Sequence, residues 1–408
     1  MQTSRAERVL VTPRQPERRY DLDWLRVLAV LLLVPFHTAL VFSHRPGDIV
    51  YAKDQVESLL LIQFAYFVNQ WHMPLLFMVA GASTWFALKS RTGGQYLKER
   101  FTRLVVPTLF GITFLIPPMI YLQFLGQPDC GSFWQFYPRF FRVDFDDLSG
   151  NAGTFTPAHL WFVIFLFVFS VVALPLFLYL RREPGRRLIN RLAGFFERRG
   201  AIFLLALPPA VAAVPFDIGG KSPFLYLTFF IYGYLLVSDA RFGRALDRHA
   251  TGALVLGTVA TVPFVYLTAG HPLPQHPAAP ILVHLMYYFS RWCWLVAILR
   301  LGRRYLNVNS RLLRYVSEAS YPFYLLHFLV NTAIAHHVIR WDAVVAVKYL
   351  VITIATVLVT YVVYDLLVKR TRVTRFLFGM RRKRGAQFHL LPIGDVWRSR
   401  WNRPGEGA

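Results

Sequence analysis

Cysteine and acidic side chains are both scarce in this sequence. Its 408 residues include two cysteines, Cys130 and Cys293, and the second lies within an apolar run, so no disulfide framework is predicted. Asp and Glu together number 22 against 45 Lys and Arg. The sequence also has no internal repeat, no low-complexity tract and no separate soluble domain of useful size. A sensory or scaffold protein with a soluble output domain is therefore the least favoured class.

Apolar residues, by contrast, are abundant and grouped. They make up 55% of the chain, the mean hydropathy is +0.40, and they form runs long enough to cross a bilayer as helices. The sequence therefore predicts an all-α polytopic membrane protein with about ten transmembrane helices. The expected spans are 24–43, 59–88, 104–125, 159–180, 201–216, 223–238, 251–269, 281–300, 315–339 and 343–368.

Basic residues fall mostly on alternate connections between these runs, which by the positive-inside rule predicts that both termini are cytoplasmic. Membrane topology thus explains the net charge of +23, and we expect a lipid bilayer and no nucleic acid as partner. We divide the chain into a basic leader at 1–23, a transmembrane domain at 24–368 and a basic tail at 369–408. The first apolar run is too long for a signal peptide and should be retained as a span.

Three histidines are predicted to lie deep in the membrane. His37, His72 and His327 fall eleven to seventeen residues from the basic residues that mark the inner ends of their helices, Arg26 in the case of His37. These separations correspond to about 16 to 26 Å along the helix axes. Ionisable groups at such depth are costly and usually functional, although a single membrane histidine more often hydrogen-bonds a neighbouring helix.

His37 is the best candidate for a catalyst, because a neutral imidazole in a low-dielectric site can take a proton from an attacking hydroxyl. Arg26, on the same helix, could hold a charged carrier at the cytoplasmic surface. A metal site is the competing interpretation of clustered histidines. We expect no metal, since no span contains a His-x3-His or Glu-x-x-His spacing and carboxylates are scarce at that depth.

Other arginines are candidates for anion binding. Arg100 and Arg103 stand in KERFTRLVVP, where the third expected helix begins, and guanidinium groups at a helix N-terminus suit phosphate. Positive-inside charge alone would also explain them. Arg291 is too deep to reach the membrane surface and should face a polar cavity or a carboxylate such as Glu318.

Two segments outside the spans have distinctive composition. The connection at 126–158 carries several aromatic residues with Asp144, Asp146 and Asp147, which suits either sugar recognition or an ordinary interfacial belt of aromatic residues. The tail contains TRVTRFLFGMRRKRG, a basic and apolar segment expected to lie on the anionic inner leaflet.

Five motifs, in order, resemble the membrane-bound acyltransferase family 3, and the resemblance covers nearly the whole chain. They are Arg26-VLAVLLLVPF-His37, HMPLLFMVAGAS, RFTRLVVP, His159-LWF and ASYPFYLLH, which ends at His327. Within the family, VPFH and the terminal YDLLVKRTRVTRFLFGM are most similar to the clade that modifies periplasmic glucans with succinyl groups. AGAS stands where many members have SGF or SGY, so the shape of the acyl pocket stays open.

The resemblance implies a multi-pass protein of the bacterial inner membrane that transfers an acyl group, succinyl or acetyl, from cytosolic acyl-CoA to a hydroxyl of an extracytoplasmic glycan. Acyl-CoA would be a co-substrate, and no cofactor would be permanently bound. His37 matches the essential histidine and Arg26 its partner on the carrier side. Arg100 and Arg103 match the basic stretch that binds the CoA phosphates.

Within this scheme His72, His327 or Trp161 would stabilise the tetrahedral oxyanion, and a covalent acyl-histidine is the other route. Trp161 and His159 are expected to bind substrate, and Arg291 could meet the carboxylate of a succinyl group. The alternative function is a transporter or flippase for a small anionic or lipid-linked molecule, which the number of spans and the deep Arg291 would also suit.

Overall fold

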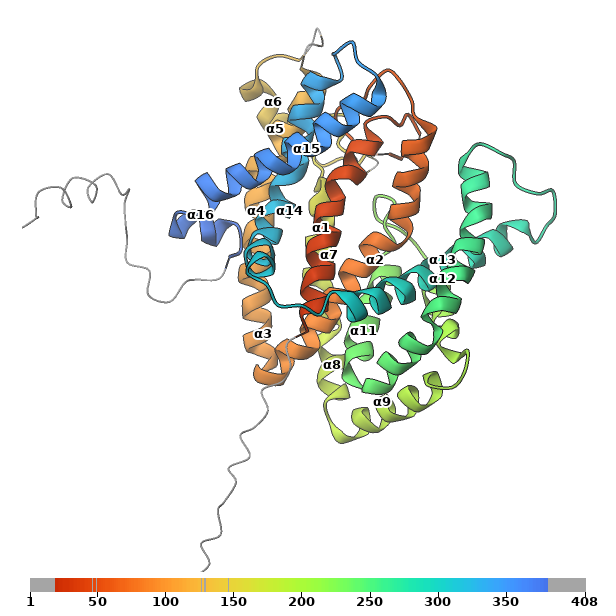
Figure 1. Cartoon of the computed structure of the whole chain (residues 1–408). Helices are drawn as coiled ribbons and strands as arrows, with labels where there is room; N and C mark the ends of the chain where they lie inside the picture. Colours follow the sequence, from red (N-terminus) through yellow and green to blue (C-terminus); the bar gives the residue numbers. More distant parts are fainter. Residues whose placement is uncertain are drawn as a thin grey trace, which may run out of the picture.

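The fold is a bundle of helices around α1 (Tyr20–Leu40), with α14 (Arg311–Val338) on one side of it and α2 (Leu59–Ser90) on the other (Figure 1). This computed structural model describes residues 19–380 apart from 46, 49, 126, 128, 129 and 146. Within the described residues there is no strand, only an isolated bridge between Ile218 and Lys221. The all-helical class predicted from the sequence is confirmed.

Every expected apolar run is helical, and several runs are broken into shorter pieces. Between α2 and α14 the elements are α3 Gly93–Arg100, η1 Phe101–Val105, α4 Val106–Phe110, η2 Gly111–Leu115, α5 Ile116–Phe124, α6 Phe133–Phe140, η3 Ala158–Leu160, α7 Trp161–Val172, α8 Leu174–Leu180, α9 Glu183–Phe196, η4 Ala201–Ala206, α10 Leu207–Ala212, α11 Pro223–Ser238, α12 Ala240–Thr268 and α13 Ala279–Tyr305. After α14 come α15 Val345–Val363, η5 Tyr364–Val368 and α16 Arg372–Leu377.

Six of the described helical segments are long and apolar enough to cross a membrane, and a seventh is added if α7 and α8, bent by 48°, form one span. The protein is therefore a multi-pass membrane protein. The remaining expected spans lie on the shorter apolar helices Ala201–Ala212 and Pro223–Ser238 and on α14, which has 28 residues but more polar side chains. The count of ten and the cytoplasmic position of both termini stay predictions.

Parallel packing of α1 and α14 aligns the two helices that carry His37 and His327. The Trp24 indole N–H donates to the carbonyl of Val308 at 3.1 Å near the start of both helices. Towards their far ends, the Asn331 amide donates to the Thr38 hydroxyl at 2.8 Å. We call the end where α1 and α14 begin and α2 ends the basic end, because Arg19, Arg26, Arg100, Arg103 and Arg303 lie there.

Two glycines bring α2 and α11 into direct backbone contact. A Cβ on Gly81 would lie 1.9 Å from the carbonyl oxygen of Phe230, and one on Gly233 would lie 1.8 Å from that of Met78. Small residues at a helix crossing permit this approach, the usual means of packing helices in lipid. The contact fixes the face of α2 that turns towards α11.

A buried ion pair holds the segment between α1 and α2 against α15. The Lys348 ammonium donates to the Asp54 carboxylate at 2.8 Å and to the carbonyl of Ile339 at 3.0 Å, and both charged side chains are buried. The Asp54 backbone N–H in turn donates to the carbonyl of Val41 at 2.9 Å, just beyond α1. This segment is therefore fixed at both its start and its middle.

The two segments singled out by composition are partly described. In the 126–158 connection, the Asp147 carboxylate accepts hydrogen bonds from the backbone N–H groups of Ser149 and Ala152 at 3.1 and 2.9 Å, so it holds its own loop. Asp146 lies outside the described residues. In the tail, α16 packs on α4, where the Phe110 and Phe378 rings lie 5.3 Å apart. Residues 1–18 and 381–408 of the predicted leader and tail are likewise not described.

Candidate active site

Three imidazoles from three separate elements meet in the middle of the bundle. His37 of α1 and His327 of α14 have ring centroids 5.5 Å apart, and His159 of η3 lies 5.3 Å from His327. Phe328 lies against this group, stacked on His37 at 4.1 Å and edge-on to His159 at 5.4 Å. All three histidines are buried. We refer to His37, His159 and His327 as the histidine cluster.

Backbone carbonyls fix which nitrogen carries the proton in two of these rings. His327 Nδ1 lies 2.7 Å from the carbonyl of Tyr324, and His159 Nε2 lies 3.3 Å from that of Leu325. Because a carbonyl only accepts, each of these nitrogens must be the donor, and the other nitrogen of each neutral ring presents a lone pair.

Those remaining nitrogens have no hydrogen-bond partner within the described chain, although they are buried. They are Nε2 of His327, Nδ1 of His159 and also Nδ1 of His37. A buried polar group without a partner costs about 1–3 kcal/mol, so native proteins rarely keep several together unless a ligand or water completes them. The cluster therefore has the features of a reaction centre.

His72, expected to act with His37, has a different environment. Its Nε2 donates to the carbonyl of Ala29 at 2.6 Å, which links α2 to α1. Its ring neighbours are Phe36 at 6.3 Å and Trp71 at 6.2 Å, and no ring contact joins it to the histidine cluster within the described residues. This hydrogen bond positions α2 against α1. His72 also lies within electrostatic range of His37 and His327, so its part in catalysis stays a prediction.

The arginines predicted to bind the carrier all lie at the basic end. Arg26 is one of them; it donates to Asp23 at 3.0 Å. It precedes His37 by eleven residues, about 16 Å along α1 and within about 20° of the same face.

The other two expected carrier arginines are anchored by α2 and by Gly379, which follows α16. Arg100 donates to the Thr84 hydroxyl at 3.2 Å and lies over the Tyr96 ring at 5.0 Å. Arg103 donates to Glu99 and to the carbonyl of Gly379, both at 3.3 Å.

Arg291 is surrounded by Tyr226, Tyr287 and Tyr288, which we call the tyrosine box, and it does not contact Glu318. Its guanidinium carbon is 4.6 Å from the Tyr287 ring centroid and 4.7 Å from that of Tyr288, and it donates to the Tyr287 hydroxyl at 2.8 Å and to the carbonyl of Gln70. The expected carboxylate partner was wrong, because Glu318 is exposed near the basic end and accepts from Arg375 at 2.8 Å.

The Arg291 guanidinium forms no salt bridge among the described residues, and its Nη1 has no hydrogen-bond partner there. The side chain is nevertheless only 5% exposed. A buried cation without a counter-ion is strongly disfavoured, so this pocket is suited to an anionic group supplied by a ligand.

Trp161 connects the tyrosine box to the histidine cluster. Its ring lies 5.2 Å from Tyr226, which is close enough to Arg291 for electrostatic interaction, and it is two residues from His159. Lys221 lies 5.8 Å above the same ring, and burial lowers the pKa of this lysine while Asp217 works in the opposite direction. Trp161 therefore packs beside the aromatic surroundings of Arg291, while His159, two residues before it, belongs to the histidine cluster.

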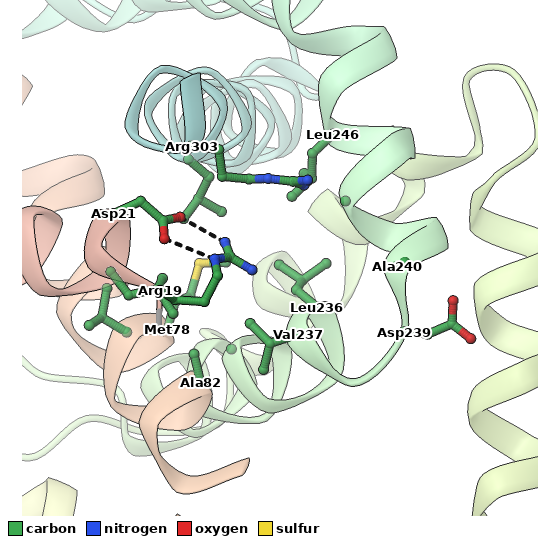
Figure 2. Close-up of a pocket in the computed structure, with 15 residues that line it drawn as sticks. Arg19, Asp21, Met78, Ala82, Leu236, Val237, Asp239, Ala240, Leu246 and Arg303 are labelled. Atoms are coloured by element: carbon green, nitrogen blue, oxygen red, sulfur yellow. Dashed lines mark hydrogen bonds and ion pairs between the residues drawn. The ribbon is translucent and has the colours of Figure 1, made fainter. Parts of the chain in front are cut away.

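A cavity of about 260 Å³ lies at the basic end, apart from the histidine cluster (Figure 2). Figure 2 shows Arg19, paired with Asp21, and Arg303 on one side of it, and apolar side chains of α11 and α2 below. The cavity is lined by Arg19, Asp21, Leu22, Met78, Val79, Ala82, Gly233, Leu236, Val237, Asp239, Ala240, Gly243, Leu246, Leu299 and Arg303. Its lining includes no histidine, so we place the reaction centre in the histidine cluster.

Within the described residues, no group of three or more His, Cys, Asp or Glu side chains is placed to hold a metal ion. Sequence reasoning had not singled out Tyr324 or Phe328. A signal was present, since Tyr324 stands three residues before His327 and Phe328 four residues after Tyr324 in ASYPFYLLHF, the spacings of a helix face.

Comparison with known families identifies the class of protein. The family model described as an acyltransferase domain matches residues 19–365, most of the chain. The chain therefore belongs to this family, the membrane-bound acyltransferase family 3 that its motifs resemble, and it is a membrane acyltransferase.

Among individual relatives, the chain is similar to the Glucans biosynthesis protein C of Escherichia coli (strain K12) and of Escherichia coli O157:H7. Each is 23% identical over 338 residues, which cover 78% of this chain and 83% of the relative. No solved structure matches the chain.

Proposed function

We propose that this membrane acyltransferase moves an acyl group, succinyl or acetyl, from cytosolic acyl-CoA to a hydroxyl of an extracytoplasmic glycan at the bacterial inner membrane. The observation that carries the proposal is the histidine cluster, with three imidazole nitrogens lacking partners at the end of a helix face that begins at Arg26. The name of the relatives supports a glucan as acceptor. The cytoplasmic position predicted for the basic end from the positive-inside rule supports CoA as the donor's carrier.

The donor's nucleotide would bind at the basic end and its thioester would reach the histidine cluster. The phosphates of CoA would meet Arg26, Arg100 and Arg103, which supply guanidinium donors at one membrane surface. A phosphopantetheine arm is about as long as the 16 Å between Arg26 and His37. The carrier therefore needs no movement across the membrane.

His37 acts as the general base in this proposal. Its imidazole takes the proton from the glycan hydroxyl as the oxygen attacks the thioester carbonyl carbon. The resulting tetrahedral oxyanion collapses, the carbon–sulfur bond breaks, and the imidazolium returns the proton to the CoA thiolate. The products are the ester and free CoA, so atoms and charge balance.

The tautomers of His159 and His327 limit what these residues can do. As neutral rings, both present a lone pair to the cluster, so they can orient an N–H of His37 or accept a proton, and either would stabilise an oxyanion only after becoming protonated. Trp161, whose indole N–H is always a donor, is the other candidate for that role. Transfer through an acyl-histidine would use the same three rings.

A succinyl donor fits the tyrosine box. The far carboxylate of a dicarboxylic acyl group would supply the counter-ion that Arg291 lacks, and the hydroxyls of Tyr226, Tyr287 and Tyr288 could donate to it. An acetyl group would leave the guanidinium uncompensated. We therefore favour a dicarboxylic acyl group.

Purified protein in proteoliposomes tests the function directly. With succinyl-CoA and a β-glucan oligosaccharide, we expect release of free CoA together with a mass increase of the glycan by one succinyl group. His37→Ala should reduce both by about 10²- to 10⁴-fold, the usual contribution of a general base. The matched control His271→Ala, which changes an exposed histidine outside the cluster, should retain activity.

Two results would contradict the proposal. Full activity in His37→Ala protein of normal stability would remove His37 from the reaction. Uptake of the oligosaccharide or of succinate without any release of CoA would favour the transporter that the sequence left as the alternative.

A further inference from the structure

One face of α14 leads from the basic end to the histidine cluster. Ser317, Tyr321, Tyr324 and Phe328 follow one another at intervals of four, three and four residues, the spacing of a single helix face. The Tyr321 and Tyr324 rings are stacked with centroids 6.4 Å apart, and Phe328 stacks on His37. Because α1 runs beside α14 in the same direction, this face spans about the same 16 Å as Arg26 to His37.

Hydroxyl groups along this path are buried and have no hydrogen-bond partner among the described residues. They belong to Ser317 and Tyr321 on α14 and to Thr108 on α4. Thr108 follows Pro107, which lies with the Tyr321 ring and the Arg103 backbone around Gly379. Two helices therefore present unsatisfied hydroxyls between the carrier arginines and the imidazoles.

Burial of these three hydroxyls is energetically unfavourable unless a polar group contacts them. Each buried hydroxyl without a partner is unfavourable, and three in sequence along one path indicate a ligand with hydrogen-bonding groups at several points along its length. A purely apolar chain, such as a lipid tail, would leave all three unsatisfied.

We propose that Ser317, Tyr321 and Thr108 position the pantetheine arm of the acyl donor. This inference rests on the proposed function. The arm carries two amides and one hydroxyl, spaced along a flexible chain, and hydroxyl side chains can either donate to an amide carbonyl or accept from an amide N–H. Ser317 and Tyr321 lie one helical turn apart, so they meet different groups of the arm, and Tyr324 lies a further turn towards the thioester.

Steady-state kinetics of Ser317→Ala and Tyr321→Phe test the assignment. A group that binds the arm equally in the ground state and the transition state changes KM and leaves kcat nearly constant. We expect each variant to raise KM for succinyl-CoA about threefold to tenfold, the effect of one net hydrogen bond, and the double variant to raise it further.

Tyr364→Phe is the matched control. Tyr364 is also buried with a hydroxyl that has no partner in the described chain, but its ring lies 6.0 Å from Tyr315, on the other side of α14. Its removal should leave KM unchanged. Thermal unfolding of all variants without ligand shows whether any change in KM reflects a loss of folded protein.

Competition between inhibitors separates the arm from the nucleotide. Ser317→Ala and Tyr321→Phe should weaken inhibition by pantetheine and leave inhibition by adenosine 3′,5′-bisphosphate unchanged, whereas Arg100→Gln should do the reverse. KM and pantetheine inhibition that match those of Tyr364→Phe would overturn the inference while leaving the acyltransferase intact. Wild-type protein that releases no CoA from succinyl-CoA would instead overturn the proposed function.

Discussion

At the level of single side chains, the most distinctive group is the Arg291 guanidinium. Most buried charges in proteins are paired with an opposite charge. The Arg291 guanidinium instead contacts two phenol rings and the backbone carbonyl of Gln70 on α2. Aromatic faces offset part of the cost of burying a cation without removing its need for a counter-ion. Binding of an anion should therefore stabilise this pocket, because it would supply the missing counter-ion.

Arg291→Gln should change which acyl group the enzyme prefers. Loss of a charge-assisted hydrogen bond costs about 1.5–3 kcal/mol, so kcat/KM for succinyl-CoA should fall about 10- to 100-fold while that for acetyl-CoA stays level or rises. Parallel kinetics with the two donors provide the measurement, with Arg291→Lys as the variant that keeps the charge. An equal fall with both donors would assign Arg291 to structure alone.

The sequence predicted the level of the functional groups along their helices better than it predicted which neighbours their side chains face. Counting residues from Arg26 placed His37 in mid-membrane, and the same counting placed His327 at a similar level. It could not show that His159 joins them, because η3 follows a long connection whose path is set by tertiary packing. It also paired Arg291 with Glu318, since matching depth alone ignores that the two residues are on helices facing different neighbours.

At the level of helices, the contact between α2 and α11 is among the closest in the structure. Both Gly81 and Gly233 would place a Cβ within 2 Å of a carbonyl oxygen, so a methyl group cannot be accommodated without separating the helices. Because α2 also carries His72 and the carbonyl that binds Arg291, its displacement would disturb both the contact with α1 and the tyrosine box.

Gly81→Ala and Gly233→Ala should each destabilise the protein strongly, by about 2 kcal/mol or more, the range seen when a well-packed site is overfilled. Thermal unfolding in detergent would measure the effect. Gly252→Ala is the control, because this glycine is also helical but has nothing within 4 Å of its Cβ position. Equal stability of all three variants would show that the two helices are farther apart than described.

The Asp147 loop should respond to acid. Burial alone would raise the pKa of Asp147, but hydrogen bonds from the Ser149 hydroxyl and from backbone N–H groups outweigh it and lower the pKa. A lowered pKa in the folded state contributes stability above the unfolded value, about 3.9, and this is lost as the pH falls through the folded value. Hydrogen exchange at Ser149 and Ala152 should therefore remain slow at pH 5 and accelerate below pH 4.

Asp147→Asn provides the control for that measurement. The amide cannot change charge in this range, so exchange at Ser149 and Ala152 should no longer depend on acidification beyond the intrinsic chemistry of the amides. If the wild-type loop and the variant respond identically, another group controls the loop.

At the scale of the whole molecule, labelling of the two cysteines can test which side of the membrane each connection faces. Cys130 is partly exposed in the connection predicted to be extracytoplasmic, and Cys293 is buried within α13. A membrane-impermeant maleimide should therefore label intact spheroplasts at Cys130 only. Labelling that is absent from spheroplasts and requires inverted vesicles would reverse the predicted topology and with it the side from which the proposed acyl-CoA would be drawn, and Cys130→Ser, which leaves only the buried Cys293, is the control for the site of labelling.

The buried pair of Asp54 and Lys348 limits how the glycan proposed as the acceptor could enter. Because the pair fixes the segment between α1 and α2 to α15, that flank is a stationary wall, and opening it would strand two charges at a cost of several kcal/mol. The 126–158 connection rests on the same wall, since the Tyr51 hydroxyl donates to the carbonyl of Ser149 at 2.9 Å. The proposed acceptor would therefore have to reach the histidine cluster without displacing either segment.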